Sequence, residues 1–153
     1  MKVILSSDHA GFAYKAILTE MLNEEGYLVH DLGAHVEMPV DDYPDYAAKV
    51  AIALQNKESE RGILICGSAV GVSIAANKFK GIRAAVCHDT YSAYQSVEHD
   101  NANILCIGQR VVGIALAEDI IRAFLNAKFS EDPRHQRRLA KIAAIEDVNM
   151  KEN

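Results

Sequence analysis

The chain has 153 residues and a mass of 16.8 kDa, and half of its residues are hydrophobic. This composition allows one sizeable core without disulfides or a structural metal, and it argues against long disorder and a multidomain plan. The 16 Lys and Arg against 21 Asp and Glu give a formal net charge of −5, which argues against a protein that coats nucleic acid.

Targeting and redox features indicate the cytoplasm. The N-terminal apolar run, residues 3–5, is far shorter than the apolar core of a signal peptide. No stretch approaches the roughly 18 uninterrupted apolar residues needed to span a bilayer. Cys66, Cys87 and Cys106 lack the spacing of a disulfide framework. We therefore expect reduced thiols in a cytoplasmic protein of one domain, residues 1–153.

Short apolar runs alternate with segments of helical hydrophobic spacing. In chain order we expect a strand at 2–7, a helix at 11–25, a strand at 27–31, a helix at 46–55, a strand at 62–66, a helix at 70–78, a strand at 82–87, a helix at 90–98, a strand at 103–107 and helices at 113–126 and about 133–148. Parallel strands need crossover helices, which cover both faces of the sheet. The pattern predicts a Rossmann-like α/β three-layer sandwich with a five-stranded parallel sheet and an extra C-terminal helix.

Ligands of open α/β sheets bind at the carboxyl ends of the strands, so the residues after each predicted strand are candidates. These residues are Asp8 and His9, Gly33, residues 66–71, His88 and Asp89, and residues 108–110. Polar and glycine residues therefore gather at one edge of the predicted sheet.

The segment Cys66-Gly67-Ser68-Ala69-Val70-Gly71 joins a predicted strand to a helix. Its backbone N–H groups could bind an anion, and we expect the helix dipole to lower the pKa of Cys66, whose thiolate could act as base or nucleophile. The alternative is a buried cysteine followed by a tight turn. The segment lacks the lysine of a Walker A loop, the arginine of a Cys-x5-Arg phosphatase loop and the third glycine of a dinucleotide fingerprint.

The histidines allow more than one interpretation. Asp8-His9 suits a proton relay or a contact with a sugar hydroxyl, or it is an N-cap with a bystander histidine. His99 lies in a polar stretch, residues 98–103, which by itself is typical of a solvated turn. We interpret His30, His35 and His88 as surface or cap residues. No HxxxH, HExxH or paired CxxC spacing occurs, so we expect no metal site.

Residues 134–141 hold four of the sixteen Lys and Arg and no acid. Arg134 and Arg138 lie four residues apart, hence on one helical face, where two guanidinium groups can hold a phosphate. Arg110, after the fifth predicted strand, could add a third. The alternative is an ordinary solvated helix at the C-terminus.

Six segments together resemble one family. They are Asp8 to Gly11, Asp42 to Pro44, Cys66 to Gly71, Ile74 to Lys78, Gly108 to Gly113 and Arg134 to Arg138. In these the chain is similar to ribose-5-phosphate isomerase of the B type, whose superfamily includes allose-6-phosphate and galactose-6-phosphate isomerases. The resemblance runs in order from residue 1 to about residue 147.

The resemblance implies a metal-free, cofactor-free aldose–ketose isomerase. It would interconvert ribose 5-phosphate and ribulose 5-phosphate through a cis-enediolate, as a homodimer or homotetramer with shared active sites. Membranes and nucleic acids are not expected partners. The C-terminal helix would pack on a neighbouring subunit.

The resemblance also implies a role for each matching residue. Cys66 would move the proton between C1 and C2, and His99 would open the sugar ring with help from Asp8. The backbone N–H groups of the loop would hold the enediolate oxygen. The full set of expected binding residues is Asp8, His9, Tyr43, Gly67, Ser68, Ala69, Val70, Gly71, Asp100, Arg110, Arg134 and Arg138, in which Tyr43 contacts the sugar, and His9 with the three arginines contacts the phosphate.

Two positions depart from the family pattern. Ala69 stands where the family has a glycine, and catalysis should survive this if Ala69 need not adopt a positive φ. His99-Asp100-Asn101 replaces the usual His-Asn-Asp order, which puts the acid Asp100 where an asparagine contacts the substrate. The sugar therefore stays open between ribose 5-phosphate and another phosphosugar, such as allose 6-phosphate, galactose 6-phosphate or a four-carbon sugar phosphate.

Three other classes compete with this interpretation. A non-catalytic phosphosugar-binding module could share the fold, although the presence of both Cys66 and His99 argues against it. A response-regulator receiver would carry an aspartate where this chain has Cys66. A nucleic-acid binder would have to rely on the basic helix alone.

Overall fold

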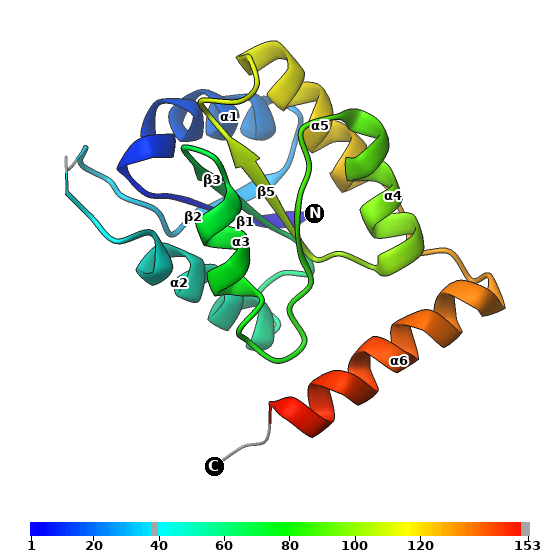
Figure 1. The fold of residues 1–153 in the computed structure, drawn as a ribbon. Coiled ribbons are helices and arrows are strands. Elements are labelled where there is room, and N and C mark those ends of the chain that lie inside the picture. Colours follow the sequence, from blue (N-terminus) through cyan, green and yellow to red (C-terminus); the bar gives the residue numbers. More distant parts are fainter. Residues whose placement is uncertain (38–39, 151–153) are drawn as a thin grey trace.

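Figure 1 shows a computed structural model that describes residues 1–37 and 40–150. The expected domain, residues 1–153, includes residues 38, 39 and 151–153, which lie outside this description. The strands are β1 (Lys2–Ser7), β2 (Leu28–Asp31), β3 (Gly62–Cys66), β4 (Ala84–Val86) and β5 (Ile104–Gly108). They form one parallel sheet in the order β2-β1-β3-β5-β4.

Helices cover both faces of this sheet (Figure 1). On one face lie α1 (Phe12–Glu24), α4 (Thr90–Asp100) and α5 (Ile114–Asn126), which share an apolar core with the strands. On the other face lie α2 (Tyr43–Gln55) and α3 (Val70–Ala76), which form a second core. Strands β3 and β5 are buried at every residue, as their unbroken apolar sequences require. The three-layer α/β fold with a five-stranded parallel sheet is confirmed.

The order of the strands creates the crevice that a ligand needs. From β1 the chain crosses to β2 on one side, and it then returns to β3 on the other side of β1. Crossovers that diverge in this way leave an opening at the carboxyl ends of β1 and β3. The short 3-10 helix η1 (His9–Gly11) follows β1 at this edge.

Four elements differ from the predicted ones by two or more residues at one end, and one of them is α4, which ends at Asp100 instead of residue 98. Strand β4 is shorter than predicted because, at its N-terminal end, the backbone N–H of Arg83 donates to the side-chain Oδ1 of Asn103 at 2.8 Å instead of to a backbone carbonyl. Helix α2 begins earlier, at Tyr43, since Pro44 fits the first turn after Asp42. Helix α3 ends sooner, at Ala76.

The C-terminal helix α6 (Pro133–Asn149) projects from the rest of the chain (Figure 1). Only His135 of this helix is buried, whereas Ile142, Ile145 and Val148 are 45%, 65% and 66% exposed. Such a helix leaves apolar surface without a partner in the single chain. Within the described ranges no helix is both long and apolar enough to cross a membrane.

Candidate active site

A cavity of about 340 Å³ opens at the carboxyl ends of β1, β3 and β5. Its lining residues are Asp8, His9, Ala10, Tyr43, Cys66, Gly67, Ser68, Gly71, Arg110 and Val111. The sequence predicted eight of these as site residues, because each follows a strand or belongs to a segment of the family resemblance. Residues that are up to about one hundred positions apart in the chain therefore meet in one place.

The centre of the cavity is a thiol beside a carboxylate. Cys66 is 9% exposed and Asp8 is 3% exposed, and the Sγ of Cys66 donates to Oδ2 of Asp8 over 3.2 Å. The other oxygen of Asp8 accepts from the N–H of Ala10 at 3.1 Å, which caps η1. Asp8 is therefore both an N-cap and a partner of the candidate base, so the two interpretations of this residue are compatible.

The expectation of a lowered thiol pKa at Cys66 is wrong for this structure. Burial and the carboxylate of Asp8 raise the pKa of Cys66, and the backbone N–H groups of Gly67 and Ala69 offset only part of this. The dipole of α3 does not prevail, because that helix has only seven residues and an anion lies against the sulfur. The resting Cys66 is a protonated thiol whose S–H group donates a hydrogen bond to Asp8.

The loop after β3 adopts a left-handed turn at Ala69. Its φ is +70°, so the condition that Ala69 avoids a positive φ is not met. The loop still forms with alanine, at an energetic cost of about 1–2 kcal/mol relative to glycine. The N–H of Val70 is directed to Oγ of Ser68 at 3.3 Å. A Cβ at Gly71 would lie 2.7 Å from the ring of Tyr43, so this ring packs directly on the glycine and would have to move to admit a side chain.

The loop after β5 is bound to the loop after β3. The N–H groups of Gln109 and Arg110 donate to the carbonyls of Cys66 and Gly67 at 2.8 and 3.0 Å. Nε2 of His88 accepts from the N–H of Gly108 at 2.9 Å, and burial lowers the pKa of His88, which favours the neutral acceptor. His88 thus supports the site loop, and its interpretation as a surface or cap residue is wrong.

Asp41 is a site residue that the sequence did not reveal. Its carboxylate accepts from Nδ1 of His9 and from the backbone N–H of His9 at 3.0 and 3.2 Å. Asp8, His9 and Asp41 each have one oxygen or nitrogen atom of the kind that can bind a metal ion, and these three atoms lie within 4.8 Å of one another. The hydrogen bond between His9 and Asp41 accounts for much of this proximity. The only available signal was the acidic run that precedes Tyr43.

Six predicted site residues do not line this cavity: Ala69 and Val70 lie in the segment 66–71 that borders it, and the other four lie on different elements. His99 stacks on His135 with ring centroids 4.0 Å apart, and its ring nitrogens contact Gln95 at 2.9 Å and Glu98 at 3.3 Å. The other three are Asp100, which lines a groove with α6, and the exposed Arg134 and Arg138. All four lie on α4 or α6, and α4 covers the sheet face opposite to α3.

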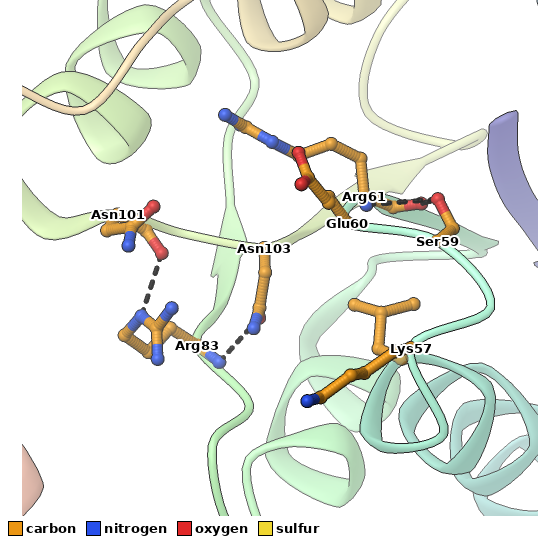
Figure 2. Close-up of a pocket in the computed structure, with 8 residues that line it drawn as sticks. Lys57, Ser59, Glu60, Arg61, Arg83, Asn101 and Asn103 are labelled. Carbon is orange, nitrogen blue, oxygen red and sulfur yellow. Dashed lines mark hydrogen bonds between the residues drawn. The ribbon is translucent and has the colours of Figure 1, made fainter. Parts of the chain in front are cut away.

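A second cavity, of about 550 Å³, lies at the amino ends of β3, β4 and β5 (Figure 2). Its arginines serve the fold. Nε of Arg83 donates to the carbonyl of Asn101 at 2.7 Å, and Arg61 donates to the carbonyls of Phe124 and Ala127 at 3.5 and 3.3 Å. Cations at helix C-termini stabilise the exposed carbonyls there. Cys66, Asp8, His9 and Arg110 lie at the other edge of the sheet.

Comparison with known proteins gives one consistent result. The family described as Ribose/Galactose Isomerase matches residues 3–142. Ribose-5-phosphate isomerase B of Escherichia coli is 48% identical over 145 residues, which cover 95% of this chain and 96% of that protein. D-erythrulose-4-phosphate isomerase 2 of Mycolicibacterium smegmatis is 39% identical over 150 residues, which cover 97% and 95%.

Solved structures agree with the sequence comparisons. Ribose-5-phosphate isomerase B of Clostridium thermocellum has a TM-score of 0.93 at 48% identity and covers 97% of this chain and 99% of its own. The enzyme of Mycoplasma genitalium with bound ribulose 5-phosphate has a TM-score of 0.89 at 42% identity, with coverage of 95% and 96%. The resemblance drawn from six short segments is thereby confirmed, and the chain belongs to the ribose/galactose isomerase family.

Proposed function

We propose that this protein interconverts ribose 5-phosphate and ribulose 5-phosphate as a metal-free, cofactor-free aldose–ketose isomerase. The observation that carries the proposal is the buried thiol of Cys66 beside Asp8 in a cavity that also holds His9 and Arg110. A thiol and a carboxylate supply the acid–base pair, and two cationic side chains suit a phosphate. The membership in an isomerase family and a relative's complex with ribulose 5-phosphate support the same reaction.

Cys66 acts as the base of the isomerisation. Its proton passes to Asp8, the thiolate takes the proton from the carbon next to the carbonyl, and the new thiol returns that proton to the neighbouring carbon. A carbon acid of this kind is weak, so its ionisation needs a stabilised enediolate oxygen. Backbone N–H groups of residues 67–71 supply that stabilisation, and those of Gly67 and Ala69 already face the sulfur.

The phosphate binds at the cationic side of the cavity. The guanidinium of Arg110 lies against Gly67, where an added Cβ would be 3.2 Å from its Nη1. His9 lies near the same guanidinium, whose charge acts on its imidazole. Binding of the remote phosphate fixes the reacting carbons against Cys66, which lowers the entropic part of the barrier. Tyr43, packed on Gly71, borders the space left for the sugar.

A second subunit completes the site. His99, Arg134 and Arg138 serve ring opening and phosphate binding only if another copy presents α4 and α6 to this cavity. The apolar residues exposed on α6 suit packing against a neighbouring subunit. Among the described residues Arg138 has no acidic partner, which suits a role in phosphate binding. We propose a homodimer or homotetramer in the cytoplasm, in which α6 packs on its neighbour.

The alternative is an isomerase of another phosphosugar, of four or six carbons. A relative named for D-erythrulose 4-phosphate is 39% identical to this chain, so the family accommodates a shorter sugar. Asp100 is the residue to examine, because its acid stands where the family resemblance places an asparagine.

Specificity constants for ribose 5-phosphate, allose 6-phosphate, galactose 6-phosphate and D-erythrulose 4-phosphate test the proposal. We expect kcat/KM to be at least about tenfold higher for ribose 5-phosphate, a difference of roughly 1.4 kcal/mol in transition-state stabilisation. A higher constant for a four-carbon or six-carbon sugar would transfer the assignment to that substrate. Asp100→Asn then shows whether the acid sets the preference, and Asp45→Asn, at an exposed acid of α2, serves as the charge-matched control.

A further inference from the structure

Asp41 reaches the cavity only through His9. Its carboxylate accepts hydrogen bonds from Nδ1 of His9 and, at both oxygens, from the backbone N–H of His9, and the side chain of Tyr46 helps to lower the pKa of Asp41. The side chain of Asp41 is 9% exposed, whereas that of His9 is 34% exposed. A nearly buried anion therefore holds a histidine whose other side is open to the cavity.

These contacts fix His9 at two points. The backbone of His9 is held by both oxygens of Asp41, and the ring is held through Nδ1. Since Nδ1 is occupied, Nε2 is the ring nitrogen that a ligand in the cavity can use. A side chain held in this way loses little further freedom when it binds an anion, so more of the interaction free energy appears as affinity.

Several charged groups face the imidazole of His9. The hydrogen bond to Asp41 is the largest influence on its pKa, and the charges of Asp41 and Asp8 act in the same direction. Burial and the charge of Arg110 act in the opposite direction, and the net effect raises the pKa of His9. His9 therefore remains an imidazolium to a higher pH than a free histidine does.

We propose that Asp41 is a positioning residue that keeps His9 oriented and cationic, so that His9 and Arg110 together bind the phosphate group of the substrate. This inference rests on the proposed function, in which His9 contacts the phosphate. Asp41 itself touches no substrate atom. It acts on the affinity for a phosphate dianion and not on proton transfer at Cys66.

Asp41→Asn tests this role, since it keeps the size of the side chain and removes its charge. We expect KM for ribose 5-phosphate to rise about tenfold above neutral pH while kcat changes less than about twofold. The Kd of inorganic phosphate should rise in parallel. Asp45→Asn is the matched control, because Asp45 is an exposed acid in the first turn of α2 whose side chain makes no hydrogen bond to any residue that the structure describes. This control should leave KM for ribose 5-phosphate and the Kd of inorganic phosphate unchanged.

A double-mutant cycle shows whether Asp41 acts through His9. In a His9→Asn background, Asp41→Asn should have no further effect on phosphate affinity. An equal loss of affinity in both backgrounds would overturn the proposal, as would a fall in kcat with an unchanged KM. Nuclear magnetic resonance of the His9 imidazole in the wild-type chain tests the proposal even if Asp41→Asn does not fold. We expect a protonated Nδ1 and a titration midpoint at a higher pH than that of a free histidine. A titration midpoint at or below that of a free histidine contradicts the role of Asp41.

These measurements separate this inference from the proposed function. If the wild-type protein binds inorganic phosphate, and this affinity depends on His9 and falls in Asp41→Asn, but the protein does not isomerise ribose 5-phosphate, the substrate is refuted and the role of Asp41 is kept. If the wild-type protein isomerises ribose 5-phosphate and Asp41→Asn has the same KM and phosphate Kd, the substrate is kept and the role of Asp41 is refuted.

Discussion

A thiol that donates to a carboxylate keeps its proton to a higher pH than a thiol in water does. Cys66 is in this state, because burial and Asp8 both disfavour the thiolate. In the proposed mechanism the base is formed only when Asp8 takes its proton, so the two residues would act as a pair. The same carboxylate that suppresses the free thiolate would then provide the route by which the thiolate forms.

Replacement of Asp8 by asparagine separates these two effects. In Asp8→Asn the pH midpoint for alkylation of Cys66 by iodoacetamide should fall, because the negative charge beside the sulfur is removed. Turnover should nevertheless fall by about 100-fold or more, since the thiol has lost its proton acceptor. Of the three cysteines only Cys66 lines the cavity, whereas Cys87 and Cys106 are 3% and 0% exposed, so alkylation reports on Cys66, and Cys66→Ala supplies the blank. A midpoint that rises or stays in place would contradict the pairing.

Residues of the site differ in how well the sequence predicts them. Asp8 follows β1, Cys66 ends β3 and Arg110 lies two residues after β5, and parallel strands bring such positions to one edge. Asp41 acts through a contact 32 positions away, from a connection that has no periodicity to place it. The role of His88 depends on the N–H of Gly108, and a pattern of side chains carries no information on such a backbone contact.

At the scale of elements, the cavity depends on how closely η1 packs against β3. A Cβ at Gly11 would lie 2.4 Å from the carbonyl oxygen of Ile65, which is the residue before Cys66. Only a glycine permits this approach of two backbones. The contact sets the distance between the strand end that carries Asp8 and the strand end that carries Cys66.

Gly11→Ala should therefore lower the free energy of unfolding by about 2 kcal/mol or more, as overpacking against rigid backbone does. Gly113→Ala is the control, because nothing lies within 4 Å of the Cβ it would add. Its cost should stay near 0.5 kcal/mol, since alanine is a poorer N-cap for α5 than glycine. Urea unfolding of the two variants measures the difference. Equal costs would show that the close approach does not constrain the fold.

The alternation of strands and helices follows from the sequence because apolar runs and helical spacing differ in period. The strand order β2-β1-β3-β5-β4 does not follow, since periodicity says which residues face a core but not which strands are neighbours. The short β4 was overestimated for a related reason. Its first residues are apolar, but Ile82 packs as part of a turn instead of pairing in the sheet.

At the scale of the whole molecule, the expected site residues form two groups. Cys66, Asp8, His9 and Arg110 share the cavity, while His99 and the arginines of α6 lie elsewhere in the same chain. Spacing along one sequence cannot distinguish a residue that serves its own cavity from one that serves a neighbour's. The resemblance alone suggested the second possibility, and the separation of the two groups supports it.

Mixed oligomers test whether sites are shared. Neither Cys66→Ala nor Arg138→Ala chains should be fully active alone, but dimers of one chain of each kind contain one site with both native residues. Random pairing of equal amounts should restore about a quarter of the wild-type activity, because half of the dimers are mixed and each has one of two sites intact. Mixing Cys66→Ala chains with chains that carry both substitutions should restore nothing. Activity that never exceeds the sum of the separate variants would place Arg138 in its own chain's site or outside any site.

Formation of ribulose 5-phosphate from ribose 5-phosphate by the purified protein is the most direct test. It should be measured with a chelator present, for the wild-type chain, for Cys66→Ala and for Cys87→Ala, whose cysteine lies buried away from the cavity. We expect turnover that is insensitive to the chelator, lost in Cys66→Ala and retained in Cys87→Ala, while Cys66→Ala still binds the sugar phosphate. Turnover in Cys66→Ala close to that of the wild type would contradict the assignment of Cys66 as the base.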